Sequence, residues 1–247
     1  MIELINYFKS NDVLNIFCDA SIMQKSNKQF SGCYGAIAVC NDDIIEKSYC
    51  ICTNTTNNDS ELKAIRLGLR LALKYRLQYS VINLFSDSQI SIFGIRDRIF
   101  NWKLTNGKII GNDNNYIKNQ FLFIELMNII VDNNLFINIY HQKGHVNLNN
   151  LVHLKEAAHV FQCSNFIRDI VSYDFIRYIS MYNNYVDNES RSILKQSRSY
   201  LYDRNYNYCD PIYFYPNDNY NTKVFNYKTI QTNNKKYMEE INYEKRQ

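Results

Sequence analysis

Residues 14–52 read LNIFCDASIMQKSNKQFSGCYGAIAVCNDDIIEKSYCIC, and this stretch decides the fold. It holds three apolar runs without helical periodicity, at 14–18, 32–39 and 44–52, each of a length typical of a β-strand. Three consecutive strands, followed by strands that alternate with helices, predict a sheet that begins as an antiparallel meander.

Helices and strands alternate after this meander. In the first predicted helix, Leu62, Ile65 and Leu69 form an apolar stripe, while Lys63 and Arg66 lie on the opposite, exposed face. Strands that alternate with helices are typical of parallel pairs joined by helical crossovers. We therefore expect an α/β fold with a mixed five-stranded sheet and helices on both faces. The expected further elements are helices at 59–75, 88–100 and 116–133 and strands at 81–85 and 136–140.

Composition limits the class of protein. The net charge of +4 is compatible with a nucleic-acid partner but does not establish one. Seven cysteines, an odd number without paired CxxC elements, argue against a disulfide framework or a ribbon-type zinc site and for free thiols. No apolar run approaches the roughly 20 residues that span a bilayer, so we expect a soluble, cytoplasmic protein without a membrane partner. Abundant Tyr and Asn with little Gly indicate an AT-rich genome, which is compatible with a viral source and then with the host cell cytoplasm.

Three carboxylates are expected at the ends of these elements. Asp19 follows the first strand, Asp87 follows the fourth, and Glu61 lies in the first turn of the first helix. Side chains at the carboxyl ends of such strands converge, and clustered carboxylates repel unless hard cations such as Mg²⁺ or Mn²⁺ neutralise them. Each residue also has a simpler explanation: the two aspartates as turn residues, and Glu61 as the capping-box partner of Asn58.

The segments around these carboxylates resemble the type 1 ribonuclease H family. The resemblance covers roughly residues 12–146 and then 183–197, and it is strongest where TTNN precedes Glu61 and where SDSQ contains Asp87. It implies a ribonuclease H-like fold and an Asp, Glu, Asp, His, Asp order of active-site residues. The matching segments are IFCDAS with Asp19, GCYGAIAV, TTNNDSELKAI with Glu61, FSDSQ with Asp87, HQKGH with His145 and NNYVDNESRSIL with Asp187.

The resemblance implies endonucleolytic hydrolysis of the RNA strand of RNA–DNA hybrids by two-metal-ion catalysis, which leaves 5′-phosphate and 3′-hydroxyl ends. Asp19, Glu61, Asp87 and Asp187 would hold two Mg²⁺ or Mn²⁺ ions. His145 would assist proton movement or product release, so its loss should slow the reaction without abolishing it. Two alternatives stay open on the residues alone: His141 competes with His145, and Asp187 could simply begin a helix with an acidic first turn.

Further residues match the positions with which the family contacts the hybrid. Asn57, Asn58 and Gln89 would read the 2′-hydroxyl of RNA, and Thr56 would hold a phosphate of the DNA strand. Residues 96–109 (RDRIFNWKLTNGKI) resemble the substrate-gripping helix and basic protrusion, in which Trp102 and Lys103 supply the aromatic and basic elements. Taken alone, Trp102 is as readily explained as a core residue.

The chain departs from the family in two places. A helical insertion, at about 148–182, separates His145 from Asp187; its apolar residues can pack as a hairpin on the sheet domain, where it could form a lid or bind a partner protein. We assign residues 1–199 to the ribonuclease H-like domain and 200–247 to a C-terminal extension. The extension mixes aromatic and basic residues, which suits stacking on single-stranded bases but also reflects the genomic bias. Like the insertion, it could bind a partner protein.

Two other functions fit the fold: a nuclease that acts on DNA, and a catalytically silent nucleic-acid-binding or assembly module. Asn57, Asn58 and Gln89 argue against the first, because a DNA nuclease has no need of them. The complete acidic set argues against the second. The biological pathway, the oligomeric state and the choice between Mg²⁺ and Mn²⁺ stay open at the level of sequence.

Overall fold

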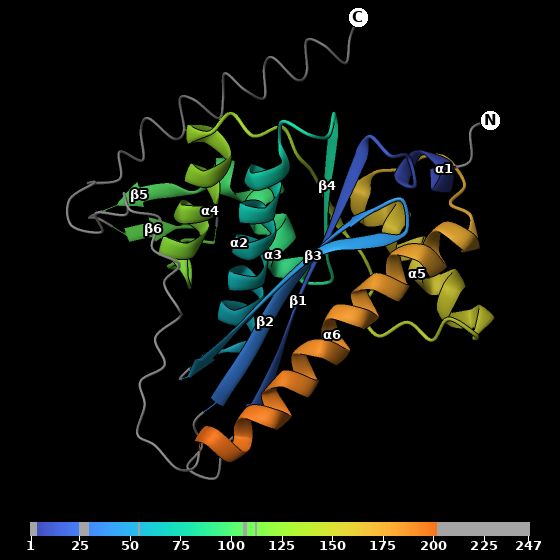
Figure 1. Ribbon diagram of the computed structural model, residues 1–247. Coiled ribbons are helices and arrows are strands. Elements are labelled where there is room, and N and C mark those ends of the chain that lie inside the picture. Colours follow the sequence, from blue (N-terminus) through green and yellow to red (C-terminus); the bar gives the residue numbers. More distant parts are fainter. Residues whose placement is uncertain (1–3, 25–29, 54, 106–107, 112, 202–247) are drawn as a thin grey trace, which may run out of the picture.

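The centre of the structure is a five-stranded mixed sheet with the strand order β3-β2-β1-β4-β7 (Figure 1). This computed structural model describes residues 4–24, 30–53, 55–105, 108–111 and 113–201, so nearly all of the predicted extension at 200–247 lies outside the described residues. The β1–β2 and β2–β3 pairs are antiparallel, and the β1–β4 and β4–β7 pairs are parallel. The predicted meander and crossovers are thus confirmed. The strands are β1 (Val13–Gln24), β2 (Phe30–Cys40), β3 (Asp43–Thr53), β4 (Val81–Ser86) and β7 (Asn138–His141).

One face of the sheet is covered by α2 (Asn57–Tyr75), α3 (Gln89–Phe93) and α4 (Gln120–Asp132). The apolar stripe predicted for α2 is fully buried at Leu62, Ile65 and Leu69. Helix α2 approaches β1 closely because of Gly68, where an added Cβ would come within 2.3 Å of the Cys18 sulfur. This close contact fixes the helix that carries Glu61 against the strand that carries Asp19.

The other face is covered by α1 (Leu4–Phe8), α5 (Leu151–Asn165) and α6 (Tyr173–Leu201). Its core is largely aromatic: Phe85 of β4 stacks on Phe17 of β1 with ring centroids 4.9 Å apart and on Tyr140 of β7 at 5.2 Å. Phe161 of α5 contacts the same layer, with its ring centroid 5.7 Å from that of Tyr140. Helices on both faces, as predicted, therefore bury both sides of the sheet.

The inserted helices pack on the sheet domain, as expected. The C-terminal boundary of the insertion differs from the predicted one. Helix α5 buries Leu154 and Phe161, and the start of α6 buries Phe175 and Ile179. Helix α6 does not stop near residue 182 but runs without interruption to Leu201, so Asp187 lies in its middle. The alternative in which Asp187 begins a helix is therefore wrong. A single apolar stripe continues from the insertion into the helix of Asp187.

Several element boundaries also differ; the strand predicted at 136–140, for example, is β7 at 138–141. Strand β1 does not end before Asp19 but continues to Gln24, because its pairing with β2 extends that far. The predicted helix at 88–100 is α-helical only over α3, followed by a π-helical turn η1 (Gly94–Arg98) and a 3₁₀ turn η2 (Ile99–Asn101). The turn widens where Phe123 of α4 lies against Gly94, at which an added Cβ would come within 2.3 Å of the ring. Helix α4 begins at Gln120, after Asn119 adopts a left-handed conformation.

The segment predicted as a basic protrusion forms a small two-stranded sheet of β5 (Lys103–Thr105) and β6 (Lys108–Ile110). All six cysteines of the described residues are free, in agreement with the thiols expected from the sequence. Within the described part of the chain, no helix has both the length and the apolar character needed to cross a membrane.

Candidate active site

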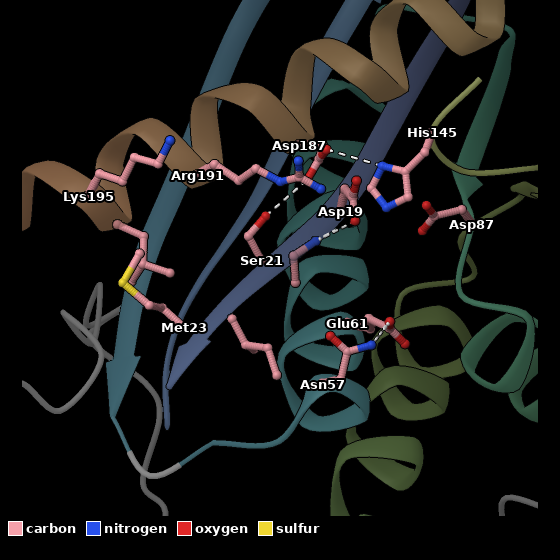
Figure 2. A pocket seen from close by; sticks show the side chains of 13 residues that line it. Asp19, Ser21, Met23, Asn57, Glu61, Asp87, His145, Asp187, Arg191 and Lys195 are labelled. Atoms are coloured by element: carbon pink, nitrogen blue, oxygen red, sulfur yellow. Dashed lines mark hydrogen bonds and ion pairs between the residues drawn. The ribbon is translucent and has the colours of Figure 1, made fainter. Parts of the chain in front are cut away.

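A pocket of about 340 Å³ lies between the N-terminal turns of α2 and the second half of α6, over β1 (Figure 2). Five elements supply the predicted catalytic residues that line it. Asp19 comes from β1, Glu61 from α2, Asp87 from the end of β4, His145 from the loop after β7, and Asp187 from α6. The structure therefore brings together all five residues named by the family resemblance.

Asp19 is the most buried carboxylate of the pocket together with Asp187, and each residue is only 6% exposed. The backbone N–H of Ala20 donates a hydrogen bond of 2.7 Å to Asp19 Oδ1, whereas Oδ2 has no hydrogen-bond partner among the described residues. Burial, and then the negative charges of Asp87 and Asp187, raise the pKa of Asp19 well above its ordinary value. An ionised Asp19 thus needs a cation beside it.

Asp87 follows β4 directly, as predicted, and its carboxyl pKa is raised to about 6 by burial and by the charge of Glu61. Asn183 of α6 opposes this shift, since its Nδ2 donates to Asp87 Oδ2 at 3.5 Å. On the other side the carboxylate touches the loop after β7: an added Cβ at Gly144 would lie 2.0 Å from Asp87 Oδ2. The glycine before His145 therefore leaves room for the carboxylate.

Glu61 is held by two hydrogen bonds near the N-terminus of α2. Asn57 Nδ2 donates to Oε1 at 2.6 Å, and the Ser88 hydroxyl donates to Oε2. The helix is capped instead by Thr56, whose hydroxyl accepts the N–H of Asp59. The capping-box explanation of Glu61 is therefore wrong, and its carboxylate faces the pocket (Figure 2).

Asp187 is surrounded by donors. The Ser21 hydroxyl donates to Oδ1 at 3.0 Å, and Arg191 Nε lies 2.9 Å from the same oxygen. His145 Nδ1 lies 3.4 Å from the other oxygen, Oδ2. These groups fix the carboxylate on the side of the pocket formed by α6.

His145, not His141, lines the pocket. Its side chain is 65% exposed, and its backbone has a φ of 52°, so the imidazole stands at the opening next to Asp187. His141 is buried in β7, where its ring accepts or donates a 2.9 Å hydrogen bond with Ser164 Oγ. Burial, with a smaller contribution from the charge of Arg96, lowers the pKa of His141, so its imidazole is held neutral inside the protein.

The pocket suits divalent cations that prefer oxygen ligands. Among the described residues, no three His, Cys, Asp or Glu side chains are close enough together to form a ready-made metal site. Nevertheless, four carboxylates face one pocket, and the unpartnered, buried Oδ2 of Asp19 lies at its floor. All four are hard oxygen ligands of the kind that Mg²⁺ and Mn²⁺ bind, and bound cations would relieve the repulsion that raises their pKa values. The residues present therefore fit such ions.

Of the residues predicted to contact nucleic acid, only Asn57 lies in the pocket. Asn57 lines the pocket, while Thr56, Gln89 and Lys103 are exposed and Asn58 is partly exposed outside it. Trp102 is 5% exposed, and its ring packs edge-on against Phe123 with centroids 5.0 Å apart. The prediction of a substrate contact for Trp102 is thus corrected to the core alternative, because its indole fills the space between η2 and α4.

Several residues near the carboxylates were not predicted: Ser21, Gln142, Asn183, Arg191 and Lys195. The sequence did contain a signal for three of them, because residues four apart share a helix face, and Asn183, Arg191 and Lys195 are spaced by four or eight from Asp187. Ser21 shares a strand face with Asp19. Gln142 donates to Asn183 Oδ1 at 2.7 Å, and nothing in the sequence indicates that contact.

The sheet order, the helices on both faces and the carboxylates gathered over β1 and β4 define a ribonuclease H-like α/β fold. A family model described as RNase H matches residues 11–156, which is more than half of the chain, so this chain belongs to the RNase H family. Among proteins with curated descriptions, none matches the sequence.

Solved structures of several RNase H domains are similar to this chain at low sequence identity. The RNase H domain of prototype foamy virus is 16% identical, with a TM-score of 0.47 over 62% of this chain and 94% of that chain. LC11 RNase H1, isolated from compost by a metagenomic approach and solved with an RNA/DNA hybrid, is 13% identical, with a TM-score of 0.40 over 53% and 85%. The N-terminal RNase H domain of a Mycobacterium tuberculosis protein is 19% identical, with a TM-score of 0.36 over 51% and 84%.

Proposed function

We propose that this protein is a ribonuclease H that cuts the RNA strand of RNA–DNA hybrids endonucleolytically and leaves 5′-phosphate and 3′-hydroxyl ends. The observation that carries the proposal is the convergence of Asp19, Glu61, Asp87 and Asp187 on one open pocket, with a buried and unpartnered oxygen of Asp19 at its floor. Membership of the RNase H family supports the same reaction class.

Two Mg²⁺ or Mn²⁺ ions would be held by Asp19, Glu61, Asp87 and Asp187. When bound, such ions activate the attacking water and stabilise the departing 3′ oxygen. The protein prepares the ligands for this role: Asn57 and Ser88 orient Glu61, Asn183 orients Asp87, and Ser21 orients Asp187. Partners of this kind commonly change metal affinity or activity by about 10–100-fold.

His145 would move a proton at the opening of the pocket or assist release of the product. Its imidazole is exposed to solvent and lies beside Asp187, so it can exchange protons with water and reach a phosphodiester bound over the carboxylates. It is not needed to hold the pocket together. Its removal should therefore slow the reaction and leave a residual rate.

Recognition of RNA would rest on amide side chains near α2 and α3. Asn57 lies in the pocket beside Glu61, and an amide can both donate to and accept from a 2′-hydroxyl. Asn58 and Gln89 would extend this contact, while Thr56 and Lys103 would hold phosphates of the DNA strand. Such contacts read the sugar and backbone, so cleavage should be largely independent of sequence.

The test compares the full chain with Asp87→Asn and, as a matched control, Asp169→Asn, which alters an exposed carboxylate outside the pocket. Each protein is incubated with labelled RNA–DNA hybrid, double-stranded RNA and duplex DNA in Mg²⁺, Mn²⁺ or chelator. We expect metal-dependent cutting of RNA in the hybrid only, lost in Asp87→Asn and retained in Asp169→Asn. Cutting of duplex DNA would favour a DNA nuclease, and a folded protein that cuts no substrate would favour a binding module.

A further inference from the structure

The inserted helix α5 ends against the edge strand β7 and bonds to its backbone. Asn165 Nδ2 donates to the His141 carbonyl at 2.7 Å, and the His141 N–H donates to Asn165 Oδ1 at 2.9 Å. The side-chain amide thus occupies both backbone groups that a neighbouring strand would pair with. The same Nδ2 also donates to the Phe161 carbonyl at 2.8 Å, which ties the amide to its own helix.

The His141 side chain links α5 to a residue of the pocket. Its Nδ1 lies 2.9 Å from the Ser164 hydroxyl of α5, and an interaction of its imidazole with the backbone of Asp87 partly offsets the lowering of its pKa by burial. The histidine is 6% exposed, so little water competes for either contact. The His141 side chain therefore connects the end of the insertion to the peptide of Asp87 through two successive polar contacts.

Arg96 of η1 holds this end of α5 in place. Its guanidinium donates to Asn165 Oδ1 at 3.0 Å and to the Ser164 carbonyl at 2.7 Å. It also lies over the rings of Phe93 and Phe166, at 5.3 and 5.7 Å from their centroids. Planar stacking with several donors in a fixed fork is a geometry that lysine cannot reproduce.

A second connection starts from the residue after His141. Gln142 donates to Asn183 Oδ1 at 2.7 Å, and Asn183 in turn donates to Asp87 Oδ2. A shift of His141 would therefore disturb Asp87 twice, once through its backbone and once through its carboxylate.

We propose that the end of helix α5 positions Asp87 for metal binding, with Ser164 and Asn165 holding His141 and His141 holding the backbone of Asp87. This inference rests on the proposed function, in which Asp87 is a metal ligand. Ser164, Asn165 and His141 are positioning residues, because none of them lines the pocket. The insertion thus supports the active site through the edge strand β7. The lid and the partner-binding surface expected from the sequence remain separate predictions.

The experiment uses the full chain with Ser164→Ala, Asn165→Ala and the control Cys163→Ala. Cys163 is an exposed neighbour on the same helical turn, and its sulfur lies 3.7 Å from the imidazole of His159. Binding of Mn²⁺ is measured by calorimetry without nucleic acid, and kcat, KM and the Mg²⁺ requirement are measured on the hybrid. The calorimetric measurement does not depend on turnover.

For Ser164→Ala and Asn165→Ala we expect Mn²⁺ affinity and kcat to fall by about 10-fold, the lower end for an indirect partner of a metal ligand. The KM for the hybrid should stay unchanged, because the substrate-facing side chains are not altered. Since both variants act through His141, adding His141→Ala to Ser164→Ala should cause little loss beyond His141→Ala alone.

Wild-type Mn²⁺ affinity and kcat in both folded variants would overturn the inference while leaving the proposed function intact. Equal losses in Cys163→Ala would also overturn it, because the effect would then belong to the stability of α5 in general. If Asn165→Ala does not fold, Ser164→Ala, which removes a single hydroxyl, decides the question. A wild-type chain that neither binds Mn²⁺ nor cuts the hybrid would instead refute the proposed function.

Discussion

Gly144 stands against Asp87, and replacing it with alanine should separate activity from stability. A Cβ added at this position would lie 2.0 Å from Asp87 Oδ2 and 3.0 Å from its Cγ, whereas real Cβ atoms essentially never lie within 3.0 Å of another heavy atom in this way. The carboxylate must therefore move by about 1 Å. Gly144 does not adopt a left-handed φ, so its backbone accepts alanine. The strain then falls on the Asp87 carboxylate.

A misplacement of roughly 1 Å at a catalytic group commonly costs about 100-fold in rate. We therefore expect Gly144→Ala to lower kcat about 100-fold, which corresponds to about 2.7 kcal/mol of transition-state stabilisation. The free energy of unfolding should change by less than about 1 kcal/mol, since alanine also restricts the unfolded chain.

The assay is steady-state cleavage of a labelled RNA–DNA hybrid at saturating Mg²⁺, with urea unfolding of the same preparations. Gly111→Ala is the matched control, because a Cβ added there would lie 3.0 Å from Asp113 and from Ile117, which are both outside the pocket. A Gly144→Ala protein with wild-type kcat would refute the reasoning. So would a loss of kcat accompanied by an equal loss in Gly111→Ala.

Three other predictions follow from the same geometry. In EDTA, the free energy of unfolding should fall as pH rises from about 4 to 7, because the pKa of Asp87 is raised to about 6 in the folded state, which therefore binds this proton more tightly than the unfolded state does. In Asp87→Asn the decline should be smaller by an amount on the order of 1–3 kcal/mol. Urea unfolding at several pH values measures both. His145→Asn, whose side chain tolerates the left-handed φ of 52°, should lower kcat about 100-fold and leave a measurable metal-dependent rate; complete loss would make His145 indispensable. Trp102→Ala should lower the free energy of unfolding by about 3–5 kcal/mol and leave KM for the hybrid unchanged, whereas a raised KM in a stable protein would restore the predicted substrate contact.

The sequence predicted the structure best where the pattern of neighbouring residues along the chain determines the local structure. The three opening strands and helix α2 are set by apolar periodicity, and the family segments placed Asp19, Glu61, Asp87 and His145 near one another. The end of β1 was missed because pairing with β2 extends the strand beyond its apolar run, to Gln24.

The remaining differences arise from contacts between distant segments. Nothing within residues 94–101 indicates the π-helical turn, at whose first residue, Gly94, the Phe123 ring of the distant helix α4 lies close to the backbone. Trp102 was undecided for the same reason, since burial depends on its neighbour Phe123. Asn183 and Arg191 could have been found from the sequence, because they lie four residues before and after Asp187 on one face of α6.

The amide of Asn165 also has a consequence for self-association. An open sheet edge invites a strand from another molecule, and proteins suppress this aggregation route by covering or charging their edges. At β7, the backbone groups of His141 are already occupied by Asn165, so this position cannot template a foreign strand. At the opposite edge, β3 carries Asp43, Glu46 and Lys47, charges that disfavour pairing with a strand of another molecule. The inserted helix thus blocks strand addition at one position of β7, the shortest strand of this sheet, which has no Asp, Glu, Lys or Arg to deter such pairing.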